Sequence, residues 1–293
     1  MDHALSWLFR VALLLMAVAF GVAAVRAWRR SSARRHPYVS EILVGLVTDF
    51  FDTLGIGSFA STTAIFKLRR MVSDELIPGT LNVGKTPSAM AEALIFVGTI
   101  EVDPVLLIST IASATVGAWV GADIVARLSR RAIQWVMGLA LLIAGSTFAA
   151  VNLSLLPGGG VAWTLLGWKF YVAVAVNFGL GVLMSAGIGL YAPCMIMLAL
   201  LGMHPLAAFP IMAGACALVQ PAASLRFFKA GAFAPGTSVG LAMGGVVGVL
   251  LAAYVVKSLP LSALRWLVIV VVAYAALAML RSAVLFRSPQ KTM

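Results

Sequence analysis

Residues 47–63 read VTDFFDTLGIGSFASTT, and this stretch decides how the chain can fold. It lies within the apolar segment 39–66, which is longer than the roughly 20 residues of one membrane span. Two acids, Asp49 and Asp52, precede Gly-Ile-Gly, and a series of hydroxyl side chains follows. Glycine is unfavourable inside helices, so two glycines in mid-segment indicate a break in the helix.

The composition indicates a membrane protein. Hydrophobic residues make up 62% of the chain and charged residues 11%, whereas soluble domains are about a quarter charged. The basic residues that give the net charge of +11 gather at the ends of apolar segments, which favours a role in topology over nucleic-acid binding. Cys194 and Cys216 lie in apolar segments without metal-ligand spacing, so we expect packing roles for them and neither a metal nor a cofactor.

The apolar segments predict an all-α polytopic membrane protein. They cover residues 4–26, 39–66, 82–100, 104–126, 132–152, 170–202, 205–228, 236–256 and 262–282. Two of them, 39–66 and 170–202, are too long for one upright span, and each contains Gly-Ile-Gly. Each is either a long tilted broken helix or a hairpin that enters and leaves on the same side of the membrane.

The loop charges favour the hairpins. Two hairpins place 16 loop Lys and Arg residues inside and 3 outside, whereas two single spans give 11 and 8. Cytoplasmic loops carry an excess of Lys and Arg. The basic cluster at 26–35 follows the first apolar run, which predicts a retained N-terminal helix rather than a signal peptide. We therefore expect the N-terminus outside and the C-terminus in the cytoplasm.

An internal repeat predicts the domain organisation. GIGSFA (55–60) matches GIGLYA (187–192), and LSRRAIQWV (128–136) matches LPLSALRWL (259–267) at nearly the same offset. Three net crossings per copy would invert the second copy, an arrangement typical of transporters. The predicted parts are an N-terminal helix with a basic cytoplasmic loop (1–38), repeat 1 (39–152), an external linker (153–169), repeat 2 (170–283) and a cytoplasmic tail (284–293).

The glycine breaks predict an anion site. A half-helix that begins after each break would point its free N–H groups and positive dipole end at the bilayer centre. Alternatively, the glycines serve close helix packing and the hydroxyls bond their own backbone. The candidate substrate-binding residues are Gly55, Gly57, Ser58, Thr62, Lys85, Gly187, Gly189, Tyr191 and Gln220.

Three acids are candidates for ion coupling. Asp49 and Asp52 lie three residues apart on one face of the first arm, where low dielectric favours a bound proton; a Na⁺ site is also compatible. Alternatively, one of them caps N–H groups at the hairpin tip. Glu92 is a second proton-carrier candidate, unless it pairs with Lys85 or another span. Lys85 either gathers anions at a cytoplasmic vestibule or extends to the membrane surface.

Two further patterns predict structural roles. Gly117-x-x-x-Gly121 and Gly244-x-x-x-Gly248 have the spacing of helix contacts. His204, at the start of a segment, is expected to be a turn residue rather than a ligand.

The segments GTLNVGKTPSAMAEALIFVGTIEVDP (79–104) and HPLAAFPIMAGA (204–215), together with the glycine-broken openings of both halves, resemble the TauE/SafE family of sulfite and organosulfonate exporters. The resemblance covers about residues 39–282. It implies a bacterial inner-membrane protein that transports small, often sulfur-containing anions, and not an enzyme.

We therefore expect a secondary transporter, in the direction of export, coupled to an ion gradient. Its partners would be a small anion and the lipid bilayer, with no nucleic acid; a homo-oligomer is left open. The alternatives are an intramembrane enzyme that uses Asp49 and Asp52, and an anion channel. The sequence leaves open which anion is carried, the direction of transport and the coupling ion.

Overall fold

The computed structural model describes residues 3–31, 33–54, 57–73, 76–100, 102–125, 160–185 and 189–256, with single positions between 131 and 155 and between 266 and 284. Within these residues the chain is helical, with one isolated β-bridge and no strand. Five of the described helices are long and apolar enough to cross a membrane. The prediction of an all-α membrane protein with several spans is therefore confirmed.

The helices follow one another along the chain as α1 (His3–Arg30), α2 (Val39–Thr53), α3 (Ser58–Arg69), α4 (Ile77–Thr99), α5 (Pro104–Val125), α7 (Trp168–Ser185), α8 (Tyr191–Leu200), α9 (Pro205–Ala230) and α10 (Pro235–Val256). The predicted spans 132–152 and 262–282 lie largely outside the described residues.

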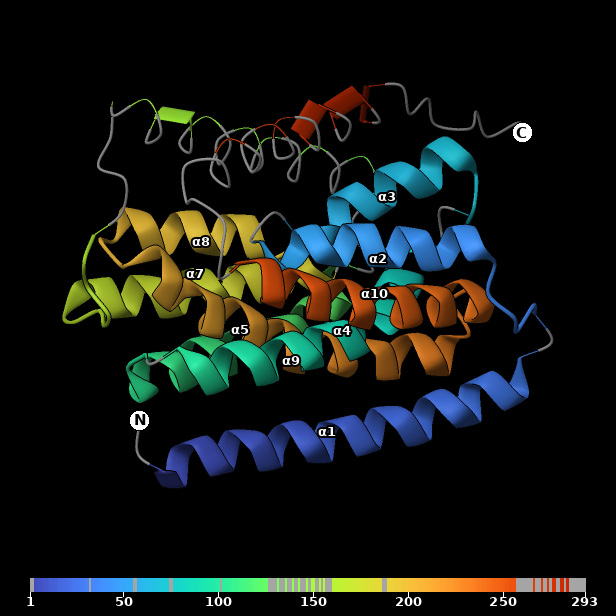
Figure 1. Cartoon of the computed structure of the whole chain (residues 1–293), viewed down its shortest axis with the longest axis horizontal. Helices are drawn as coiled ribbons and strands as arrows, with labels where there is room; N and C mark the ends of the chain where they lie inside the picture. Colours follow the sequence, from blue (N-terminus) through green and yellow to red (C-terminus); the bar gives the residue numbers. More distant parts are fainter. Residues whose placement is uncertain are drawn as a thin grey trace.

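Both long apolar segments are divided into two helices. The first consists of α2 and α3, and α3 lies beside α2 (Figure 1). Gly57, between them, has a φ of 86°, a left-handed conformation that glycine adopts at little cost. The second segment consists of α7 and α8, which also contact each other. Gly55 and Gly187 lie outside the described residues, and the path of both segments through a membrane stays a prediction.

The bundle is built from paired helices around a buried centre. The pairs α2 with α10, α5 with α7, and α4 with α9 make the most extensive contacts, while α1 lies at the edge and packs mainly on α9 (Figure 1). The helix contacts show an internal symmetry when α2, α3, α4 and α5 are matched in order with α7, α8, α9 and α10. The contact of α2 with α10 then corresponds to that of α7 with α5, and the contact of α4 with α10 to that of α9 with α5. Two repeats would produce this symmetry, although their inverted relation stays a prediction.

Glycines allow α2 and α10, and likewise α5 and α7, to approach each other closely. A Cβ at Gly248 would lie 2.3 Å from the Leu46 carbonyl oxygen, and a Cβ at Gly117 would lie 2.1 Å from the Phe178 carbonyl oxygen. Only a residue without a side chain fits such contacts. The prediction that the Gly-x-x-x-Gly patterns are helix contacts is confirmed.

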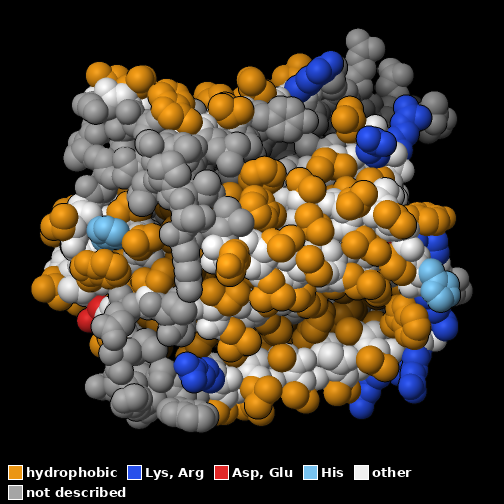
Figure 2. Space-filling model, in the orientation of Figure 1, with side chains coloured by type: hydrophobic (Ala, Val, Ile, Leu, Met, Phe, Trp, Pro, Cys, Tyr) orange, Lys and Arg blue, Asp and Glu red, His pale blue; other side chains and the backbone are white. Residues whose placement is uncertain are grey.

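The surface agrees with a position in a bilayer. Hydrophobic side chains cover the flank of the bundle, and Lys and Arg side chains gather mainly at the end where α1 leads into α2 (Figure 2). Helix α9, in contrast, is largely buried. Polar side chains of α2, α4 and α9, among them Asp49, Lys85 and Gln220, are buried inside the protein rather than exposed to lipid.

Single cysteines test the predicted topology. In a protein whose two native cysteines are replaced by alanine, Leu68→Cys and Val161→Cys lie at positions 79% and 87% exposed. The charge distribution predicts that an impermeant thiol reagent labels residue 68 only from the cytoplasmic side and residue 161 only from the outside. Outside labelling of residue 68 would exclude the first hairpin and the inverted repeat.

Candidate functional site

A buried ion pair lies at the centre of the bundle. Helix α2 carries Asp49 and α4 carries Lys85, and each side chain is only 1% exposed. The Lys85 ammonium bonds Asp49 Oδ1 and also donates to Thr48 Oγ1 at 2.9 Å, while Ser88 Oγ donates to Asp49 Oδ2 at 2.7 Å. Lys85 thus does not extend to the membrane surface as one alternative expected, and its role in binding an anion stays a prediction. Its amine is held inside because Asp49 offers it a charged partner.

The backbone of α10 packs directly against the ion pair at Gly245. A Cβ at Gly245 of α10 would lie 2.1 Å from Asp49 Oδ2, so any larger residue would displace the carboxylate. The sequence reasoning missed Thr48 and Gly245. Thr48 directly precedes Asp49 in an apolar span, which is a usable signal, whereas Gly245 is one of many glycines and carries none.

Asp52 caps the first half-helix. The Ser58 N–H donates to Asp52 Oδ1 at 2.9 Å, and Ser58 Oγ donates to Asp52 Oδ2 at 2.5 Å. The capping alternative therefore describes Asp52, whose negative charge lies at the positive end of α3. Thr62 Oγ1 donates to the Ser58 carbonyl at 2.7 Å. Neither hydroxyl is free to bind a substrate in this conformation, contrary to the expectation for the first tip.

Among the described residues, the second half-helix has no comparable side-chain cap at its N-cap position. The residue before α8, Leu190, offers no side-chain acceptor to its first N–H groups. The two tips lie next to each other: a Cβ at Gly57 would be 3.8 Å from Tyr191 Cβ, and one at Gly189 would be 3.5 Å from Phe59 Cβ.

Three buried side chains beside the tips have polar atoms without a hydrogen-bond partner. They are Glu92 Oε1 of α4, the Tyr191 hydroxyl at the start of α8 and Gln220 Oε1 of α9, each side chain at most 2% exposed. Glu92 lies close to Tyr191, Thr53 and Asp52, and Gln220 lies close to Cys216, so these atoms have polar neighbours that do not reach hydrogen-bonding geometry. Buried polar groups in native proteins are normally bonded, so each exception asks for an explanation.

The two cysteines and His204 make contacts that indicate structural roles. Cys194 and Cys216 are free and buried, and Cys194 Sγ lies 3.6 Å from Asn177 Oδ1. His204 precedes α9, and its Nδ1 accepts from the Leu206 N–H at 3.2 Å, as expected of a turn residue. Among the described residues, no group of three or more His, Cys, Asp or Glu side chains could hold a metal ion.

These features define a helical membrane protein whose transmembrane core contains a polar site with an ion pair and unpaired polar atoms. A family model described as "Sulfite exporter TauE/SafE" matches residues 1–148, half of the chain. The chain therefore belongs to the TauE/SafE family, which consists of membrane transporters and not of enzymes. Its partners accordingly include a small-molecule substrate and the lipid bilayer.

The extent of the match differs from the expected one. The family model covers the N-terminal helix, so the expectation that this helix lies outside the family region is wrong, and the match ends before α7. No curated protein matches the chain.

Proposed function

We propose that the protein is a secondary transporter that exports small anions, including sulfur-containing ones, across a bacterial inner membrane and couples their movement to an ion gradient. One observation carries this proposal: polar atoms of Glu92, Tyr191 and Gln220, from three helices, are buried next to the two helix breaks without partners. In a membrane such groups are costly and mark substrate or ion pathways. A bound ligand would supply the missing partners.

The buried charges favour coupling to a cation. Asp49, Asp52 and Glu92 provide three carboxylates, and Lys85 is the one buried Lys or Arg side chain among the described residues. With every group ionised, an excess of negative charge would repel an anion. An anion can therefore enter favourably only if protons or another cation enter the site as well, which is the physical basis of coupling.

Lys85 is the group we propose to hold the anion. Its ammonium is bound by Asp49 in this structure, and opening of that contact would free the ammonium for a substrate oxyanion. The uncapped start of α8, at Gly189, Leu190 and Tyr191, would donate N–H groups to the same ligand. Asp52 already occupies the start of α3, so the two tips differ in role.

The helix breaks would let the starts of α3 and α8 move relative to each other. Transporters built from inverted repeats have broken helices of this kind. The internal symmetry of the helix contacts supports this, since α2–α10 and α5–α7 correspond. A channel with the same tips would need no coupling cation, and the site's excess of carboxylates favours the transporter.

Substitution at the second tip tests the proposal. A side chain at Gly189 would fill the space beside Phe59, where a Cβ already has a neighbour at 3.5 Å, whereas a Cβ at Gly179 meets nothing within 4 Å. We expect Gly189→Leu to reduce sulfite flux in proteoliposomes to that of empty vesicles, and Gly179→Leu to retain it. Wild-type flux in a correctly inserted Gly189→Leu protein would exclude the tip as the site.

A further inference from the structure

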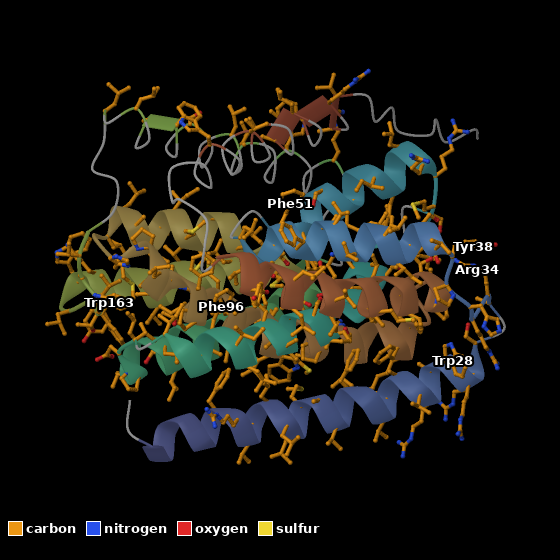
Figure 3. All side chains as sticks on the ribbon, viewed as in Figure 1. Trp28, Arg34, Tyr38, Phe51, Phe96 and Trp163 are labelled. Atoms are coloured by element: carbon orange, nitrogen blue, oxygen red, sulfur yellow. The ribbon has the colours of Figure 1, made fainter. Side chains whose placement is uncertain are left out.

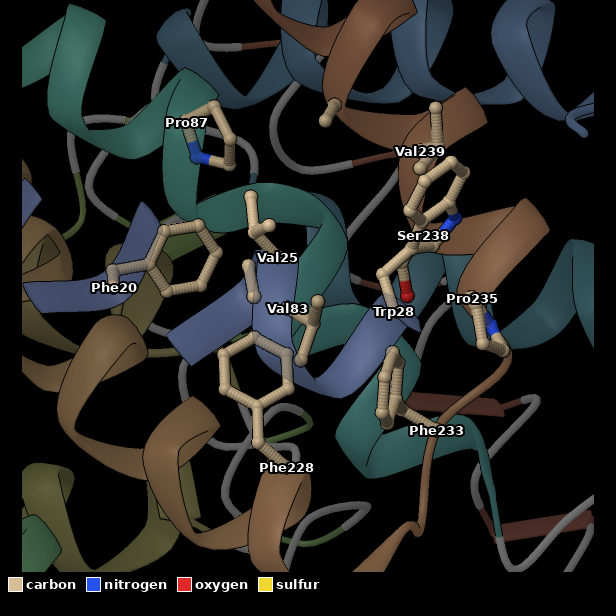
Figure 4. A pocket seen from close by; sticks show the side chains of 12 residues that line it. Phe20, Val25, Trp28, Val83, Pro87, Phe228, Phe233, Pro235, Ser238 and Val239 are labelled. Carbon is tan, nitrogen blue, oxygen red and sulfur yellow. The ribbon is translucent and has the colours of Figure 1, made fainter. Parts of the chain in front are cut away.

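An apolar groove lies between α1 and the rest of the bundle. It has a volume of about 320 Å³ and opens at the protein surface, and Figure 4 shows the side chains that line it. Its walls come from four helices, with Phe20, Ala24 and Trp28 on α1, Val83 on α4, Phe228 on α9 and Val239 on α10. Val83 and Pro87 of the groove flank Lys85 along α4, but Lys85 itself bonds Asp49 and does not line the groove.

Basic residues lie at the end of the groove that Trp28 forms. The last turn of α1 carries Arg29 and Arg30, and the Arg35 guanidinium lies 5.3 Å from the ring centroid of Trp28, which lines the groove. Arg35 is held there by hydrogen bonds to the carbonyls of Ser31 and Arg29. Trp28 and Arg34 lie at the same end of the molecule (Figure 3), where basic side chains gather (Figure 2).

We propose that this groove binds an anionic phospholipid of the surrounding bilayer. An acyl chain would lie against Phe20, Ala24 and Val83, and the phosphate would meet Arg29, Arg30 and Arg35. The charge complementarity selects this occupant, because basic groups at the end of a cleft between membrane helices bind anionic headgroups. Tryptophan beside them suits the boundary between hydrocarbon and headgroups. The lipid would connect α1 to α10 and strengthen the attachment of the peripheral helix.

Thermal unfolding in detergent tests this proposal. Phosphatidylglycerol and phosphatidylcholine with identical acyl chains are added to the purified wild-type protein. We expect phosphatidylglycerol to raise the unfolding midpoint by about 5 °C at saturation, and phosphatidylcholine to raise it much less. Native mass spectrometry is expected to show one retained phosphatidylglycerol per chain.

Two variants with matched controls locate the site. Ala24→Phe fills the groove and is expected to remove the phosphatidylglycerol effect, while Ala112→Phe, on the exposed flank of α5, keeps it. Arg35→Gln is expected to remove most of the preference for phosphatidylglycerol, while Arg69→Gln, an equal charge change on exposed α3, does not.

Three results would overturn the proposal. They are equal stabilisation by both lipids in the wild type, undiminished phosphatidylglycerol binding in both Ala24→Phe and Arg35→Gln, and an octanesulfonate effect that equals that of phosphatidylglycerol and is lost in Ala24→Phe. The last result would make the groove a site for amphiphilic substrates. Arg35→Gln keeps the test decisive if Ala24→Phe fails to fold.

Discussion

Replacing Lys85 with methionine is expected to lower the free energy of unfolding by about 3–5 kcal/mol and to abolish anion transport. Lys85 and Asp49 form an ion pair in which each side chain is 1% exposed. Removing the ammonium leaves the Asp49 carboxylate buried with Ser88 as its remaining partner. Asp49→Asn is expected to have a similar effect, because it leaves the ammonium without its counter-charge.

The double variant Asp49→Asn/Lys85→Met separates stability from transport. It contains no unpaired buried charge, so its stability is expected to return most of the way to that of the wild type, while transport stays absent. Denaturant unfolding in detergent and flux in proteoliposomes measure the two effects. A double variant no more stable than the single variants would contradict the pairing, and one that transports like the wild type would make the pair purely structural.

The Arg34–Glu41 pair provides the control. Arg34 is 34% exposed while Glu41 is buried, and Glu41 keeps its bonds to the Tyr38 N–H and Thr237 when Arg34 is replaced. Arg34→Met is therefore expected to change stability little and to leave transport intact.

The second large effect concerns Glu92. Glu92→Gln keeps the size of the side chain but removes titration, and the amide can still meet the neighbouring Tyr191 and Thr53 side chains. We expect normal folding, while sulfite flux no longer responds to an imposed pH gradient. Glu41→Gln is the matched control: Glu41 is equally buried but bonds Arg34 and Thr237, and its replacement is expected to leave the pH response intact. A full pH-gradient response in Glu92→Gln would exclude Glu92 as the proton carrier.

Local features of the chain were predictable from its sequence. Hydropathy identified the apolar segments, and the described helices α2 and α3 end and begin on either side of the first Gly-Ile-Gly, whose role as a helix break stays a prediction. A capping role was one of the two alternatives for the acids, and Asp52 has it. Asp52 reaches the Ser58 N–H because the chain turns between these two residues. Such features depend on residues close in sequence, so a pattern of residue types is enough to predict them.

Contacts between distant helices were not predictable in the same way. Lys85 reaches Asp49 because α2 and α4 both pack against α10, where Gly245 leaves room for the carboxylate. Nothing in the spacing of these residues specifies that approach, and both predictions for Lys85 placed it near the membrane surface. Polar residues in the spans marked Glu92 and Gln220 as candidates, but their position beside the tip of α8 depends on the packing of three helices.

The central claim is that the buried polar site binds an anion and couples its movement to protons. Sulfite flux from proteoliposomes, measured as the imposed pH gradient is varied, tests this claim most directly. The account predicts that wild-type flux rises with the gradient, that protons move together with sulfite, and that the Asp49→Asn/Lys85→Met protein shows neither. Sulfite flux that is independent of the gradient and equal in the double variant would contradict it.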